Sequence, residues 1–333
     1  MSKRLLVLLV AIASTFSSGI VLAGEGWNPL SGATAQGSII NTRHNLTMSY
    51  LGAAAQLMDS YRNNYGEICV YCHTPHGANA QVDAPLWNRT INTSQYQVFD
   101  KVRTLNQPIT QPGPNSLTCL SCHDGTISPD SIINMPGSGR YNKTAETVWD
   151  PNALDAWARD YGGKGPIGLG SVGHKRLQKT PSGDSCMACH NPSEVQAGAN
   201  PASDFTVFSI EEDLRDDHPI GILFPYLYGE ALIPGRDFYV PTGTQVGKMD
   251  FFDTDGDGYP EKDEVRMYDT GDGPEVECAS WHDPHGFPSA GTGTRFNPSF
   301  LRVNNGVVND GTAGTAGIVS NTGSALCLTC HDK

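Results

Sequence analysis

The residues with the clearest chemical meaning are cysteines, of which the chain has nine. Eight of them form four pairs at the spacing Cys-x-x-Cys, each followed at once by a histidine: Cys69 and Cys72, Cys119 and Cys122, Cys186 and Cys189, and Cys327 and Cys330. Residues three apart lie on one side of a helical turn, so two thiols can each reach a vinyl group of one haem while the histidine faces the iron. This is the spacing of c-type haem attachment. A redox-active cysteine pair and a zinc site are the alternatives, and four motifs that each end in histidine argue against both.

A fifth segment, Cys278-Ala279-Ser280-Trp281-His282, has the same pattern except that Trp281 stands where the second cysteine would be. It continues as Asp283-Pro284-His285-Gly286, which parallels Thr74-Pro75-His76-Gly77 after the first motif. Two interpretations stay open: a fifth haem held by a single thioether to Cys278, or a lost haem and a free thiol. The chain has ten histidines, enough for two axial ligands on each of five haems, whereas four haems would leave two histidines spare. We therefore predict four haem c groups and a fifth at Cys278 and His282.

The histidines divide into two groups of five. The proximal ligands by position in a motif are His73, His123, His190, His282 and His331. The predicted distal ligands are His44, His76, His174, His218 and His285, for each of which a solvated loop histidine is the alternative. His76 and His285 lie too close in sequence to a motif histidine to reach the other face of the same haem, so we expect each to ligate a neighbouring haem. Iron with two histidine ligands has a lowered reduction potential and no open position, so it passes electrons without binding substrate.

A second metal site is predicted between residues 253 and 264, which match the twelve-residue calcium-binding EF-hand loop. The expected oxygen donors are Asp253, Asp255, Asp257, the carbonyl of Tyr259, Glu261 and Glu264. Gly258 stands where the loop turns sharply. The flanking sequence lacks two long helical patterns, and Pro260 lacks the N–H that paired loops share. We therefore expect a lone Ca²⁺ loop that stabilises its surroundings, with an acidic solvated turn as the alternative.

The N-terminal segment predicts export. Lys3 and Arg4 precede the apolar run 5–13, and Val21-Leu22-Ala23 offers a cleavage point, so residues 1–23 are predicted to be a signal peptide. Serines and a threonine interrupt the run too early for a membrane anchor, and no later segment is long and apolar enough to span a bilayer. We expect secretion to the outer cell surface or the medium, with the periplasm as the alternative. The net charge of −13 repels phosphate backbones and argues against nucleic-acid binding.

Composition predicts an unusual interior. Only 38% of the residues are apolar, while the chain has 37 glycines and 22 prolines, so conventional cores are hard to build across this length. We expect a mostly irregular, haem-cored multihaem cytochrome c fold of short helices and loops with a few short strands. Helical patterns cover 50–63 and 152–161, strand-like runs cover 204–210, 249–252 and 300–303, and 306–324 is predicted to be a surface loop.

The motifs also suggest a division of the chain. After the signal peptide, residues 24–219 form a multihaem region with three complete motifs. Residues 220–275 are predicted to be an insertion that carries the calcium loop. Residues 276–333 form a C-terminal haem region with the degenerate motif and the last complete one.

At these positions the chain resembles the multihaem c-type cytochromes of metal-reducing bacteria. The resemblance covers about residues 40–333. It is carried by Arg43-His44-Asn45, Cys72-His73-Thr74-Pro75-His76, Pro85-Leu86-Trp87-Asn88, Cys119 to Gly125, Asp217-His218-Pro219, His282-Asp283-Pro284-His285-Gly286 and Cys327 to His331. It implies that motif and non-motif histidines are paired axial ligands, and some members of that family polymerise into extracellular filaments with a continuous haem stack. The sequence departs from the family pattern at Trp281.

Three functions follow as hypotheses. The leading one is an exported electron carrier in extracellular electron transfer, with other redox proteins or extracellular electron acceptors as partners. The alternative is a multihaem reductase of a small oxyanion that uses the irregular site at Cys278 and His282. The third is a filament in which self-association matters as much as redox chemistry. A high-spin haem would favour the reductase, a purely low-spin spectrum the carrier, and microscopy would reveal the filament.

Overall fold

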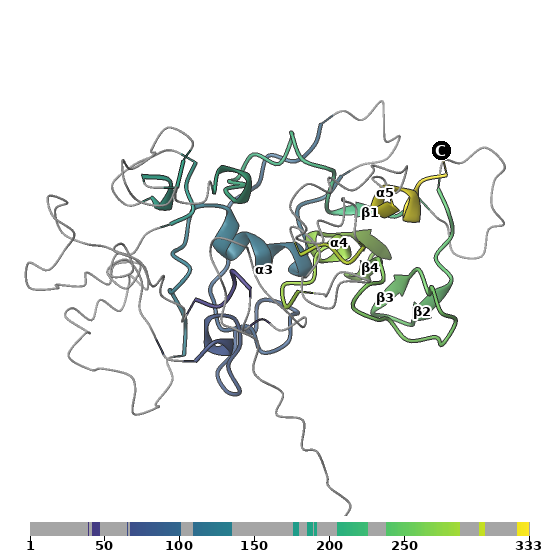
Figure 1. The fold of residues 1–333 in the computed structure, drawn as a ribbon, viewed down its shortest axis with the longest axis horizontal. Coiled ribbons are helices and arrows are strands. Elements are labelled where there is room, and N and C mark those ends of the chain that lie inside the picture. The colour runs from purple at the N-terminus through teal and green to yellow at the C-terminus, as the bar shows by residue number, and fades with distance from the viewer. Residues whose placement is uncertain are drawn as a thin grey trace, which may run out of the picture.

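The structure is a computed structural model that describes residues 39, 42–46, 65, 67–100, 109–134, 176–179, 185–188, 190–191, 205–225, 238–286, 300–303 and 325–332. Within these residues the chain is mostly irregular, with a few short helices and one small antiparallel sheet (Figure 1). This agrees with the coarse architecture that composition predicts. In the same residues, no helix has the length and apolar character needed to cross a membrane.

The helical elements are short. They are η2 (Cys69–Tyr71), α3 (Pro114–His123), η4 (Cys186–Ala188), η5 (Thr206–Phe208), α4 (Cys278–Trp281) and α5 (Ala325–Cys330). The longest is α3, with ten residues, which begins at Pro114, where a proline has no hydrogen bond to lose. All but η5 contain a cysteine of a motif, so the cysteine patterns and the helical turns coincide.

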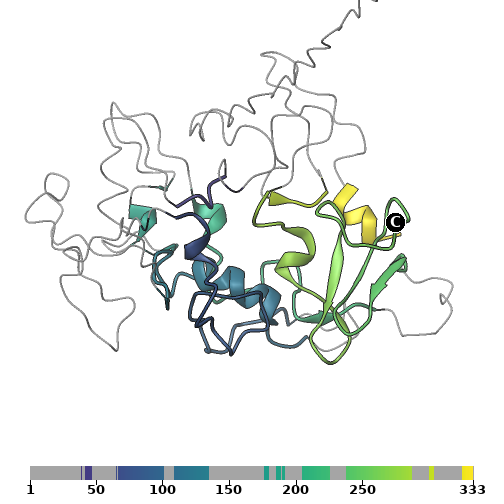
Figure 2. The ribbon, with the colours of Figure 1, turned by 90° about the horizontal axis from the view of Figure 1, so that it is seen from below.

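The sheet has five strands in the order β1-β5-β4-β3-β2, all antiparallel. The strands are β1 (Ile222–Leu223), β2 (Gly243–Gln245), β3 (Met249–Phe251), β4 (Arg266–Asp269) and β5 (Pro274–Val276). Gly243 pairs with Phe251, and a Cβ added at Gly243 would lie 2.3 Å from the Phe251 ring, so only glycine fits there. Figures 1 and 2 both place the sheet beside α4 and α5, so the segment that carries it lies next to two cysteine motifs.

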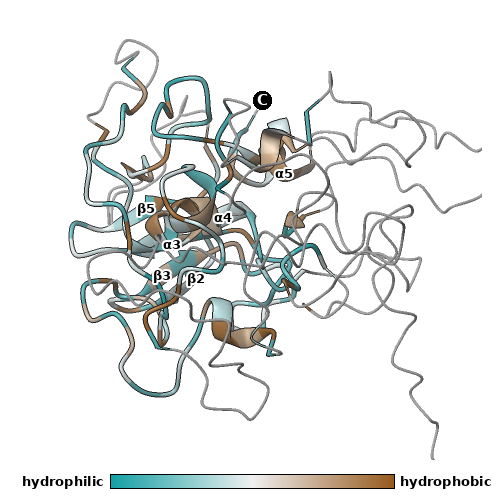
Figure 3. Cartoon of the chain, turned by 90° about the vertical axis from the view of Figure 1, so that its left-hand side faces the viewer, coloured by the Kyte–Doolittle hydropathy of each residue, from teal (hydrophilic) through white to brown (hydrophobic). Residues whose placement is uncertain are grey.

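Buried apolar side chains form three small clusters, each in contact with a motif cysteine. The first lies on the sheet (Ile222, Phe224, Phe252, Val265, Met267, Val276) and packs against Cys330. The second (Tyr65, Val70, Tyr71, Ile132) packs against Cys72, and the third (Tyr96, Leu120, Leu214, Ile220) against Cys278. Figure 3 shows hydrophobic residues in short stretches among hydrophilic loops. The apolar interior is therefore distributed around the motifs.

One of the three predicted strands is confirmed and two are wrong. The strand at 249–252 is confirmed as β3. The strand at 300–303 is wrong, because Phe300 has a φ of 61°, and only Leu301 forms an isolated bridge, with His282. The strand at 204–210 is also wrong: residues 206–208 form the 3₁₀ turn η5, and the Phe205 ring stacks on His190. The predicted helices at 50–63 and 152–161 and the loop at 306–324 lie outside the described residues.

Candidate functional site

Each cysteine motif forms one helical turn. The backbone N–H of the motif histidine donates to the carbonyl of the first cysteine, at 2.7 Å for His73 and Cys69, 3.1 Å for His190 and Cys186 and 2.9 Å for His331 and Cys327. The second motif lies within α3. The degenerate motif makes the same bond, from His282 to Cys278 at 3.1 Å. The turn therefore brings the described cysteine pairs to one side, as the chemistry requires; Cys189 lies outside the described residues.

Two histidine pairs have the same separation between ring centres. His73 and His285 are 6.3 Å apart with nearly parallel rings, and His44 and His123 are 6.3 Å apart with rings at 74°. A metal–nitrogen bond of about 2 Å, with about 1.1 Å more from nitrogen to ring centre, places two ligands of one iron about 6.2 Å apart. Each pair joins a motif histidine to a predicted distal histidine. Both separations would suit two ligands of one iron.

Five predicted ligands are oriented by a hydrogen bond at Nδ1. The bonds are His44 to the Pro284 carbonyl (2.8 Å), His73 to the Pro85 carbonyl (2.7 Å), His123 to the Phe208 carbonyl (2.7 Å), His218 to the Pro219 carbonyl (2.9 Å) and His285 to the Asp283 carboxylate (3.1 Å). When Nδ1 donates, Nε2 is left with its lone pair, which is the arrangement of a histidine that binds metal.

Burial keeps several of these rings neutral. It lowers the pKa of His44 to about 4, and the nearby rings of His123 and His285 lower it further against the opposing bond to the Pro284 carbonyl. Burial also lowers the pKa of His123 and His218. A neutral imidazole is the form that ligates iron, so these side chains need not lose a proton on binding at neutral pH.

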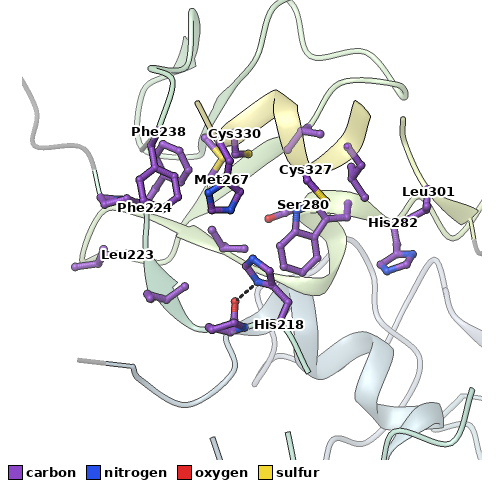
Figure 4. A pocket seen from close by; sticks show the side chains of 18 residues that line it. His218, Leu223, Phe224, Phe238, Met267, Ser280, His282, Leu301, Cys327 and Cys330 are labelled. Atoms are coloured by element: carbon purple, nitrogen blue, oxygen red, sulfur yellow. Dashed lines mark hydrogen bonds between the residues drawn. The ribbon is translucent and has the colours of Figure 1, made fainter. Parts of the chain in front are cut away.

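The last motif opens onto a cavity of about 280 Å³. Cys327, Cys330 and His331 line it together with His218, which the sequence predicts as a distal ligand. Figure 4 shows His218 and both cysteines projecting into this space. Apolar side chains of the sheet complete the walls, among them Ile222, Phe224, Met267 and Val276. Thiols, three histidines, of which His282 is the third, and an apolar lining fit the donors and surface that a haem requires.

The other predicted ligands are less completely described. His190 stacks on Phe205 with ring centres 3.9 Å apart, and the predicted distal ligand His174 lies outside the described residues. His76 is exposed, and among the described residues its ring contacts no other histidine. His282 lines the cavity of the last motif.

Sequence reasoning missed the groups that orient the histidines. The carbonyls of Pro85, Pro284 and Phe208 are backbone atoms, so no residue type marks them. Asp283 is different, because a carboxylate two residues before His285 is a visible signal for a hydrogen-bond acceptor. Trp281 stands at the position of a second cysteine, and the structure places its side chain in the wall of the last motif's cavity, which no sequence signal indicates.

The acidic loop between β3 and β4 brings the predicted calcium donors together. Oxygens of Asp253, Asp255 and Asp257 lie within 4.8 Å of one another, and so do those of Asp255, Glu261 and Glu264. Glu264 is only 1% exposed, and loss of hydration together with neighbouring carboxylates raises the pKa of Glu261 to about 7. Crowded carboxylates of this kind fit a hard cation with oxygen ligands.

The comparisons with known proteins add no assignment. No protein-family model matches the chain, and no curated protein matches it significantly. Any functional assignment therefore depends on the motifs and their geometry.

Proposed function

We propose that the protein is an exported multihaem c-type cytochrome that carries electrons between closely spaced haems, each with two histidine ligands. The observation that carries the proposal is the pair of 6.3 Å separations, between His73 and His285 and between His44 and His123. Haem c supplies one-electron exchange at iron. The residues that would hold it are the motif cysteines, through thioethers, and the motif and distal histidines, through Nε2.

Contacts between the first two motifs support transfer between neighbouring sites. His44, which pairs with His123, donates from Nδ1 to the carbonyl of Pro284, the residue before His285. The first two motifs are also linked through neighbouring residues, because the Asn88 N–H donates to the Cys72 carbonyl at 2.8 Å and the Arg89 guanidinium donates to the Ser121 carbonyl at 2.7 Å. Short distances between centres favour electron transfer along the chain to other redox proteins or extracellular acceptors. Self-association into a filament is a further form of this proposal.

The spin state of the haems tests the carrier against the reductase. If every haem has two histidine ligands, the native protein has a purely low-spin spectrum, and its reduced form does not bind carbon monoxide. A high-spin haem that exchanges ligands would contradict the carrier and favour the oxyanion reductase. Visible and electron paramagnetic resonance spectra of the purified native protein measure this directly.

A calcium ion in the loop 253–264 is the second part of the proposal. It is supported by the grouping of three aspartates around one point and by the buried carboxylate of Glu264. Gly256 and Gly258 have φ of 81° and 80°, so glycine is required for the turn at both positions. The ion would bind the loop that connects β3 and β4 and so stabilise the sheet that lines the cavity of the last motif.

A further inference from the structure

The thiol of Cys278 lies against the second motif. Glu277, the residue before α4, is fully buried, accepts the Gly113 N–H at 2.9 Å and is hydrogen-bonded to the Ser116 hydroxyl. The Cys278 N–H also donates to the Ser116 hydroxyl, at 2.8 Å. These bonds fix the start of α4 on α3, the helix that contains Cys119. Cys278 is thus held beside a complete motif.

Cys278 does not line the cavity of the last motif, although Ser280, Trp281 and His282 of the same segment do. Cys278 and Trp281 both pack against the cluster of Tyr96, Leu120, Leu214 and Ile220. Leu120, the most buried member, is 0% exposed. A macrocycle attached at Cys278 would have to displace these side chains, and a packed interior accommodates such an insertion poorly.

The Trp281 side chain is part of the cavity wall at the last motif. It lines the same cavity as Cys327 and Cys330, and its ring centre lies 4.4 Å from that of His218 with the two rings nearly perpendicular. The indole therefore forms part of the wall around the predicted distal ligand of the last haem.

Pro284 and His285, near the end of the segment, lie beside two further histidines, His44 and His73. The His285 ring lies opposite His73, and the Pro284 carbonyl accepts the hydrogen bond of His44. Side-chain and backbone groups of residues 278–286 therefore face the first, second and last motifs.

We infer that the segment Cys278–Gly286 attaches no haem of its own and is a junction that supplies walls and ligands to three neighbouring haem sites, so that the chain carries four haems. The inference rests on the proposed function, because it concerns how those sites are built. It assigns a role to each unusual residue: Cys278 packs beside Cys119, Trp281 closes the last cavity, and His285 ligates the first haem. Four haems use eight of the ten histidines, and two remain for other roles.

The Trp281→Cys variant tests the inference, because it restores a complete Cys-x-x-Cys-His motif at residues 278–282. If the segment is a junction, the variant still carries four covalent haems, and the potential of one haem shifts because a cavity wall is lost. If the segment is a damaged haem site, the variant gains a fifth haem with two thioethers. The haem number follows from intact mass and from pyridine haemochrome absorbance per polypeptide.

Three controls make the result specific. Ala279→Cys adds a thiol to the same turn without completing a motif, and Trp281→Phe keeps an aromatic wall; both should retain four haems and nearly native potentials. Cys278→Ala should also retain four haems, and loss of a haem from this variant would overturn the inference. A native mass with five haems overturns the junction but leaves the electron carrier intact, whereas a native chain without covalent haem overturns both.

Discussion

At the scale of single residues, the chemistry of this protein depends on which histidine nitrogen carries the proton. His44, His73 and His123 each donate from Nδ1 to a backbone carbonyl, which fixes the ring and leaves Nε2 for a metal. Their acceptors come from distant parts of the chain; His44 and Pro284 are 240 residues apart. A folded backbone is therefore needed to orient the ligands, although the motifs alone identify His73 and His123 as candidates.

Variants of His285 and His76 test whether His285 is a haem ligand. Both follow a motif histidine by three residues, but only His285 lies opposite another histidine, His73, among the described residues. We expect His285→Ala to convert about one haem per chain to a high-spin form that binds carbon monoxide. His76→Ala is the comparison variant: it keeps the native spectrum if His76 is one of the two histidines that four haems leave over, and it gains a high-spin haem if His76 is a distal ligand. A His285→Ala protein that stays fully low-spin would exclude His285 as a ligand.

At the scale of elements, the contact between α3 and α4 depends on a carboxyl group with an altered pKa. Burial raises the pKa of Glu277 to about 7, with a smaller contribution from Glu275, against the hydrogen bonds from Ser116 and Gly113. Because the folded-state pKa is higher than the unfolded one, folding binds a proton between about pH 4.5 and 7. The stability from this group is complete below that range and is lost as the pH rises through it.

The Glu277→Gln variant tests the effect. The free energy of unfolding of the native protein should fall between pH 5 and 8 by up to about 3 kcal/mol through this group, whereas the variant lacks this contribution. Urea denaturation at both pH values measures the difference between the two proteins. Glu67→Gln, at an exposed carboxylate, should retain the native dependence on pH. Equal slopes for Glu277→Gln and the native protein would exclude Glu277 as the source.

The loop between β3 and β4 should bind calcium through Glu264. Glu264→Gln replaces a carboxylate that can bind through two oxygens with a neutral amide, so Ca²⁺ affinity should fall by about tenfold or more. Calorimetric titration of chelator-treated protein measures the affinity. Asp263→Asn is the matched control, since Asp263 is exposed and belongs to neither group of clustered donors. If chelator leaves proteolysis at residues 250–265 unchanged, the calcium assignment is wrong.

The sequence predicts local turns better than it predicts which side chains meet in the folded chain. The period of the cysteine motifs predicts their helical turns correctly, because a turn is a local property. The strand expected at 300–303 fails because Phe300 takes a left-handed conformation beside His44, whose ring lies 4.3 Å away. Pairing of His73 with His285 or His44 with His123 was open in the sequence, since spacing restricts the partners but only tertiary contacts select them.

At the scale of the whole molecule, the apolar residues are few and dispersed. The three buried clusters of the described residues contain between four and six members each, and every cluster touches a motif cysteine. In the proposed function, haems supply the apolar surface that joins these clusters. The sheet then has a definite role, because its side chains line the cavity of the last motif.

The net charge of −13 leads to a prediction about electron exchange. A negative surface attracts cations at low ionic strength, and salt screens this attraction beyond about 8 Å at physiological concentration. A cationic one-electron mediator should therefore reduce the protein faster at low salt, by about tenfold, with the rate falling as salt is added. An anionic mediator of similar potential should show the opposite dependence, and a neutral one little change. Stopped-flow reduction of the haems measures all three rates. If the anionic mediator reacts faster at low salt, electrons enter through a local positive surface, and the net charge does not govern the encounter with partners.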